Sequence, residues 1–269
     1  MKQKHPIGIF DSGIGGLTVA QSIRNLMPGE DLIYFGDTAH MPYGDKSDDS
    51  IKYYSIKISH FLLKQNVKAI VMACNTASAL AFNVVREFVD NQVPVFNVID
   101  PMVDFISKKY NTATKIGIIG TKATIRSKAY EQKLHQNGFQ KVASLATPLL
   151  APMIEEGFFN NNISRTIIHS YLGKRKLSGI KALVLACTHY PLIKKDIIDY
   201  YQGKVDVLDS ADITAEFVQN ALKKNNLLNT QQKQGKNEFY VSELTESFQK
   251  SSHLFFKSSF RLKEKNIWI

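Results

Sequence analysis

Two short segments of the sequence place the same residue types around the only two cysteines of the chain. Residues 70–78 read IVMACNTAS and residues 183–191 read LVLACTHYP, so Cys74 and Cys187 each follow an apolar run and precede small polar residues. Such a run is typical of a buried parallel strand that delivers its last residues to a crevice. One buried cysteine is usually a packing residue, whereas two in matched settings indicate a shared chemical role.

Two thiols that face one carbon atom can act as an acid and a base. A thiolate accepts a proton and a thiol donates one, so a pair on opposite sides of a carbon acid can invert a stereocentre without a redox cofactor. This reaction needs groups that bind carboxylates and stabilise a carbanion-like transition state. A helix N-terminus after each sulfur, with a donor such as His189, predicts thiol pKa values lowered towards neutrality.

Other chemistries fit the sequence less well. Two cysteines and one histidine supply too few ligands for a structural zinc site, and there is no CxxC pair, so we expect no metal. The glycines at 13 and 15 begin a dinucleotide-binding pattern, but Thr18 occupies the third glycine position, and no P-loop is present. A single nucleophilic cysteine, as in an amidase, leaves the second copy without a function. We therefore expect no cofactor.

The bulk properties restrict the class of protein. A chain of 269 residues can form one large domain or two of ordinary size. We find no signal-peptide core and no apolar run long enough to cross a bilayer, so we expect a cytoplasmic protein with reduced cysteines and no membrane partner. The formal charge of +10 suits an anionic partner, but the lysines are scattered. This pattern favours a basic surface over a nucleic-acid partner.

The elements that must position the cysteines alternate between strands and helices. In the first half, strands are predicted at 7–10, 32–35, before Cys74 and at 93–98, with helices at 17–26, 49–64 and 76–90. A second round has strands at 115–121, 142–146, before Cys187 and at 205–208, with helices at 125–137, 148–156 and 162–172. A helix at 211–224, an exposed loop at 225–237, a strand at 239–241 and a helix at 246–256 follow.

This order predicts an α/β fold of two similar lobes, with mainly parallel sheets flanked by helices. Ligands in open α/β sheets bind beyond the carboxyl ends of the strands. If the lobes face each other, both cysteines reach one crevice, which is the expected active site.

The motifs at 11–16 (DSGIGG), 42–44 (PYG), 73–77 (ACNTA), 120–121 (GT) and 186–191 (ACTHYP) together resemble glutamate racemases of the aspartate/glutamate racemase family. The resemblance spans residues 7 to about 210. It implies a cofactor-independent two-base reaction on glutamate, a role in supplying D-glutamate for peptidoglycan, and a homodimer. It also implies a first lobe of residues 1–97 plus 209–269, to which the C-terminal segment returns, and a second lobe of residues 98–208.

The resemblance also implies roles for individual residues. Cys74 and Cys187 are implied as the two bases, Asp11 and His189 as the residues that support them, and Glu155 as a further carboxylate, with Glu156 as the alternative one position along. The residues implied to bind the substrate are Asp11, Ser12, Tyr43, Gly44, Asn75, Thr76, Thr121, Thr188 and His189. Two alternatives stay open at this stage: a racemase for aspartate or another acidic amino acid, and a basic binding protein whose cysteines only pack.

Overall fold

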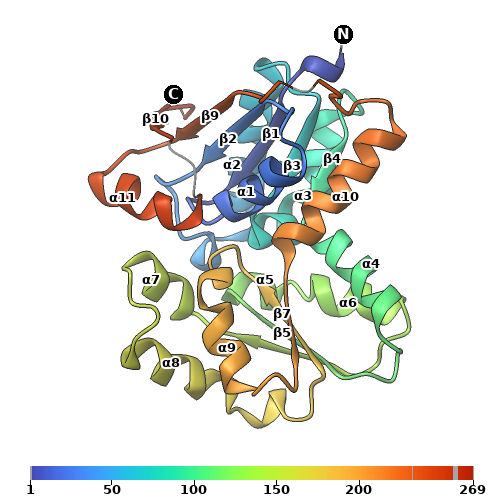
Figure 1. Ribbon diagram of the computed structural model, residues 1–269, viewed down its shortest axis with the longest axis vertical. Helices are drawn as coiled ribbons and strands as arrows, with labels where there is room; N and C mark the ends of the chain where they lie inside the picture. Colours follow the sequence, from blue (N-terminus) through green and yellow to red (C-terminus); the bar gives the residue numbers. More distant parts are fainter. Residues whose placement is uncertain (1, 232, 257–259, 269) are drawn as a thin grey trace.

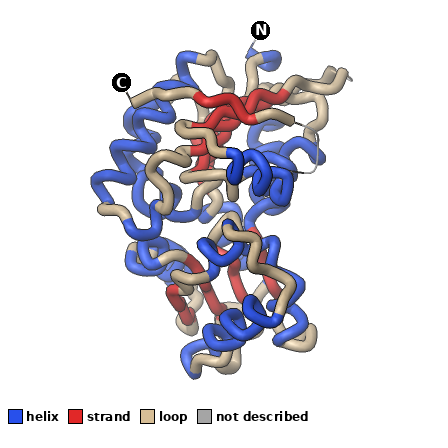
Figure 2. The backbone as a smooth tube through the Cα atoms, turned by 90° about the vertical axis from the view of Figure 1, so that its left-hand side faces the viewer, coloured by secondary structure: helices blue, strands red, loops and turns tan. Residues whose placement is uncertain are grey.

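The computed structural model describes residues 2–231, 233–256 and 260–268. The chain forms two lobes, each built on its own sheet, stacked one above the other in Figure 1. Every strand pair in both sheets is parallel, which confirms the predicted fold class. Figure 2, turned by 90°, shows the same division, with strands at the centre of each lobe and helices around them.

The first lobe contains a six-stranded sheet with the order β10-β9-β2-β1-β3-β4. Its strands are β1 (Ile7–Asp11), β2 (Leu32–Gly36), β3 (Ala69–Met72), β4 (Val95–Asn97), β9 (Asn237–Val241) and β10 (Leu262–Glu264). The central strand β1 is buried along its whole length. Because β9 pairs with β2 and β10 pairs with β9, the C-terminal strands extend the first sheet.

Helices cover both faces of this sheet. The helices are α1 (Leu17–Leu26), α2 (Asp48–Lys64), α3 (Asn75–Val89), α10 (Ser210–Lys224) and α11 (Glu246–Phe255), with short 3-10 turns η1 (Lys2–Lys4) and η2 (Tyr43–Asp45). Alternation along β1 explains the arrangement: Ile7 and Ile9 pack in the cluster that contains α1 and α10, whereas Phe10 packs in the cluster that contains α2 and α3. Both clusters are buried.

The second lobe contains a four-stranded sheet with the order β6-β5-β7-β8. Its strands are β5 (Ile116–Gly120), β6 (Val142–Ala146), β7 (Ala182–Ala186) and β8 (Asp206–Asp209). Its helices are α4 (Ile99–Lys109), α5 (Lys122–Arg126), α6 (Ala129–Gln136), α7 (Leu150–Glu155), α8 (Asn162–Leu172) and α9 (Lys194–Tyr200), with 3-10 turns η3 (Arg175–Leu177) and η4 (Tyr190–Ile193). The lobe boundaries at 97/98 and 208/209 stay a prediction.

The structure differs from the predicted elements in a few places. The single helix expected at 125–137 is wrong, because α5 ends at Arg126 and α6 begins at Ala129, with Lys128 between them in the left-handed region at φ 56°. The helices α4 and α9 and the strand β10 were not predicted. Within the described residues, no helix combines the length and apolarity that a membrane span requires.

Candidate active site

Both cysteine strands end at one small cavity between the lobes. The cavity is lined by Ser12, Met41, Pro42, Tyr43, Gly44, Cys74, Asn75, Thr76, Thr121, Ala151, Glu155, Ala186, Cys187, Thr188 and His189. The residues come from the carboxyl end of β7 and from the segments that follow β1, β2, β3, β5, β6 and β7, which is where parallel sheets bind ligands. Its volume of about 30 Å³ leaves room for little more than a water molecule. The two lobes are therefore closed on each other.

Cys74 is the N-cap of α3 and belongs to the first lobe. Its Sγ accepts a hydrogen bond from the backbone N–H of Ala77 at 3.4 Å, and its thiol donates to the Ser12 hydroxyl at 3.6 Å. Burial, and then the negative charge of Asp11, raise the pKa of Cys74 to about 12, against the lowering effect of those two contacts. The sequence-based expectation of a lowered pKa is wrong for this thiol, because burial outweighs the helix N-terminus.

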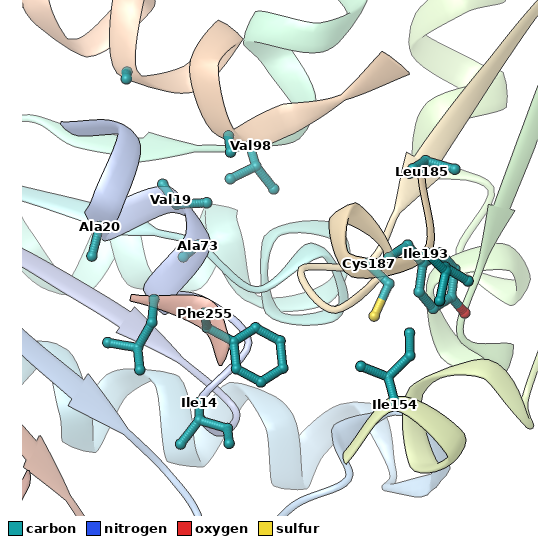
Figure 3. Close-up of a cluster of buried hydrophobic side chains, with 14 of the residues drawn as sticks. Ile14, Val19, Ala20, Ala73, Val98, Ile154, Leu185, Cys187, Ile193 and Phe255 are labelled. Carbon is teal, nitrogen blue, oxygen red and sulfur yellow. The ribbon is translucent and has the colours of Figure 1, made fainter. Parts of the chain in front are cut away.

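Cys187 follows β7 and enters the cavity from the second lobe. Its Sγ lies 3.6 Å from Nδ1 of His189. Cys187 also belongs to a buried apolar cluster, which contains Phe255 of α11, and Figure 3 shows its sulfur near Ile154. The ring of Phe255 packs edge-on against His189, with the centroids 5.3 Å apart. The helix α11 thus packs against the histidine that lies beside Cys187.

His189 lies between a thiol and a carboxylate. Its Nε2 is 2.8 Å from Oε1 of Glu155, an ion-pair distance, although Nε2 forms no aligned hydrogen bond within the described residues. Burial lowers the pKa of His189, but the contacts with Cys187 and Glu155 outweigh it and raise this pKa well above its ordinary value. Of the two neighbouring carboxylates considered from the sequence, Glu155 lines the cavity and Glu156 is exposed.

Asp11 ends β1 and is fully buried beneath the turn that carries Ser12. Its Oδ2 accepts hydrogen bonds from the backbone N–H groups of Gly16 at 2.9 Å and Gly13 at 3.3 Å, while Oδ1 has no partner within the described residues. Burial raises the pKa of Asp11, and the charge of His189 opposes this effect. Asp11 is the one predicted site residue that does not line the cavity; it lies directly behind the lining.

The remaining predicted residues all line the cavity. They are Ser12, Tyr43, Gly44, Asn75, Thr76, Thr121 and Thr188. The hydroxyls of Thr76, in the first lobe, and Thr121, in the second, are 2.9 Å apart. The structure therefore brings together polar groups that are far apart in the sequence.

Sequence reasoning missed the residues that support Tyr43. The Tyr43 hydroxyl donates to Oδ2 of the fully buried Asp37 at 2.7 Å. Asp37 is also 2.9 Å from Nδ1 of His40 and accepts from the hydroxyl of Ser242 at 2.8 Å. The ring of Trp268, near the C-terminus, packs edge-on against His40 with centroids 4.5 Å apart. The polar loop after β2 was the available signal, but the contacts from residues 242 and 268 join segments distant in sequence.

The arrangement suits proton transfer at carbon. Two thiols from different lobes reach a cavity with room for little more than a water molecule, beside a histidine whose raised pKa favours its charged form. Hydroxyl and amide groups around them suit an anionic substrate. The fold and the site together are those of an enzyme that carries out acid–base chemistry.

Comparisons with known proteins agree with this class. The Asp/Glu/Hydantoin racemase family matches residues 16–218. The glutamate racemase of Geobacter metallireducens is 40% identical over 90% of this chain and 89% of its own length, and that of Neisseria meningitidis serogroup A is 41% identical over 91% and 90%. The crystal structure of glutamate racemase from Francisella tularensis in complex with D-glutamate superposes with a TM-score of 0.92, at 36% identity, over 99% of both chains.

The chain therefore belongs to the Asp/Glu/Hydantoin racemase family. Within that family, the relatives described above are glutamate racemases, which are isomerases.

Proposed function

We propose that this protein interconverts L- and D-glutamate by a cofactor-independent reaction in which Cys74 and Cys187 act as the two bases. The observation that supports it best is that both thiols line one closed cavity, from opposite lobes, in a chain whose relatives are glutamate racemases. Cysteines that only pack in a core do not need to border a cavity lined with polar groups. The observation therefore disfavours the alternative of a basic binding protein whose cysteines only pack.

The proposed reaction moves one proton in and one proton out. One cysteine, as thiolate, takes the α-hydrogen of glutamate, and the other, as thiol, returns a hydrogen to the opposite face of the same carbon. The net charge of the pair is unchanged, and the thiol and thiolate exchange places. The charge on His189 stabilises negative charge that develops on Cys187, 3.6 Å away. Cys74, with its pKa of about 12, is suited to begin as the proton donor.

The substrate carboxylates are proposed to bind the polar lining. The candidate groups are the side chains of Ser12, Tyr43, Asn75, Thr76, Thr121 and Thr188 and the backbone near Gly44. The cavity is far smaller than a typical ligand pocket of about 300 Å³ or more, so the lobes must separate before glutamate can enter. Closure then removes water, which strengthens the electrostatic contacts inside.

The wider setting is part of the same proposal. By its resemblance to the family, the protein supplies D-glutamate for peptidoglycan, works in the cytoplasm and forms a homodimer. Its two cysteines are free rather than joined, which agrees with a reducing compartment. Aspartate is the alternative substrate for the same chemistry, and the glutamate racemases among the relatives favour glutamate.

Polarimetry in D₂O tests the proposal. We expect the protein to racemise either enantiomer of glutamate and to introduce deuterium at the α-carbon, with aspartate converted much more slowly. The variants C74S and C187S should each lose racemisation by about 10²–10⁴-fold, the usual contribution of one acid or base. Undiminished activity in both variants would remove the two-base assignment. No turnover, together with salt-sensitive retention on DNA, would favour the binding protein.

A further inference from the structure

The side chain of Asn75 reaches the cavity with its amide held at one end only. Asn75 is the first residue of α3, directly after Cys74, and is almost fully buried. Its Oδ1 accepts a hydrogen bond of 2.7 Å from the hydroxyl of Tyr130, while its Nδ2 has no partner within the described residues. A buried amide nitrogen without a partner costs free energy unless a ligand supplies an acceptor.

Tyr130 approaches Asn75 from the other lobe. It lies on α6 and is buried in the apolar cluster that also contains Met102 and Leu134. Among the described residues, the hydrogen bond to Asn75 is the only one that its hydroxyl makes. Burial, and then the charge of Asp100, raise the pKa of Tyr130, so the hydroxyl keeps its proton.

These contacts fix which end of the amide meets the cavity. If the amide were turned around, Nδ2 would donate to the Tyr130 oxygen, and the buried hydroxyl proton would lose its only acceptor. With Oδ1 towards Tyr130, the hydroxyl is satisfied and the two N–H bonds of Asn75 remain for a ligand. An N–H donor suits a carboxylate, whereas an amide oxygen in its place repels one.

We propose that Tyr130 is a positioning residue, which acts through Asn75 by orienting its amide so that Nδ2 donates to a carboxylate of the substrate. The inference rests on the proposed function, because it takes the acidic amino acid as the ligand. Tyr130 itself does not line the cavity. Its role is therefore confined to the orientation of a neighbour that does.

Loss of the Tyr130 hydroxyl should weaken substrate binding rather than slow the chemical step. In Y130F both orientations of the amide become accessible, and a carboxylate meets the donor only part of the time. The Asn75 contact is present in the bound substrate and in the transition state alike, so KM should rise and kcat should hold. Because a hydrogen bond to a charged group contributes strongly to binding, we expect its partial loss to raise KM about tenfold.

A double-mutant cycle tests the inference, with racemisation measured for wild type, Y130F, N75A and Y130F/N75A. We expect Y130F to raise KM about tenfold with kcat within about twofold, and to have no further effect on KM in the N75A background. The control is Y110F, which removes another tyrosine–acceptor hydrogen bond in the same lobe, from Tyr110 to Asp206, and should leave KM unchanged. Thermal melting separates a loss of stability from a loss of binding.

Each other outcome decides against the inference. An unchanged KM in Y130F, a fall in kcat alone, or the same rise in KM with and without Asn75 would show that Tyr130 does not act through the amide. In those cases the wild type still racemises glutamate, and the proposed function stands. A wild-type protein that neither racemises nor binds glutamate, measured by calorimetry, would overturn both.

Discussion

The Sγ of Cys187 lies 3.6 Å from Nδ1 of His189, while the other thiol, Cys74, contacts a serine hydroxyl at 3.6 Å and a backbone N–H at 3.4 Å. The charged neighbour of Cys74 is Asp11, which raises its pKa. The two thiols therefore stand in electrostatically opposite surroundings, one beside a cation and the other beside an anion. In the proposed reaction, each direction begins with proton removal by a different cysteine. The asymmetry of their surroundings should therefore distinguish the two directions.

Substitution of His189 should change the α-deuterium isotope effect differently for the two enantiomers. In H189N, proton transfer at Cys187 loses its stabilising charge, and we expect kcat/KM to fall about 10²-fold. Because the enantiomers have equal free energies, kcat/KM must fall equally in both directions. The asymmetry should appear in the α-deuterium isotope effect, which should increase for the enantiomer whose proton Cys187 removes. For the opposite enantiomer, whose proton Cys74 removes, the isotope effect should not increase, and an equal increase for both enantiomers would contradict the assignment.

The buried thiol of Cys74 should make stability depend on alkaline pH. Its pKa is raised from 9.0 to about 12 in the folded protein, so above pH 9 the unfolded chain loses a proton that the folded chain keeps. This contribution to stability is complete below pH 9 and is lost between pH 9 and about 12, at no more than about 1.4 kcal/mol per pH unit. Urea unfolding at pH 8 and 10 should show a smaller loss in C74S than in the wild type. Equal losses would mean that Cys74 ionises normally.

Gly44 is required for the lobes to close. A Cβ at this position would lie 2.8 Å from Cβ of Thr121 in the opposite lobe, and neither atom is the end of a flexible side chain. We expect G44A to lower kcat/KM by about 10²-fold, since a displacement of about 1 Å costs that much. The melting temperature should hold, because the packing within each lobe is unaffected. Activity close to that of the wild type would show that closure tolerates the added methyl group.

The ion pair of Lys68 and Glu30 should matter for stability and not for activity. Both side chains are buried in the first lobe, and neither lines the cavity. In K68M the carboxylate of Glu30 loses its charged partner and, among the described residues, keeps only the backbone N–H of Asn229, and we expect a loss of about 3–5 kcal/mol in the free energy of unfolding. The double variant K68M/E30L should recover most of this loss, because no unpaired charge remains. Urea denaturation measures the free energy of unfolding of both variants. We expect both to keep an unchanged KM for glutamate.

The sequence predicts most of the scaffold, because the strands are continuous apolar runs and the helices are amphipathic. The bounds of α1, β6 and α8 agree residue by residue with the predicted ranges. The break between α5 and α6 was missed because Lys128 has a left-handed backbone, and nothing in the local pattern indicates that conformation. The positions of Cys74 and Cys187 in the site were predictable, because each lies within two residues of the end of a strand.

The supporting contacts were not predictable from sequence. Tyr130 meets Asn75 across the two lobes, and Ser242 meets Asp37 from the far end of the chain. Such pairs depend on how whole elements pack, whereas a motif describes only neighbours along the chain. The pKa of Cys74 was missed for the same reason, because the apolar surroundings that desolvate it come from other segments.

Trp268 is the only tryptophan of the chain, and its ring lies against His40, which shares the buried carboxylate of Asp37 with Tyr43 of the cavity. The protein thus carries a built-in optical probe a few contacts away from the proposed substrate. Its emission should change when the loop that holds Tyr43 moves, so the opening and closing of the lobes can be timed by stopped-flow fluorescence without any attached label.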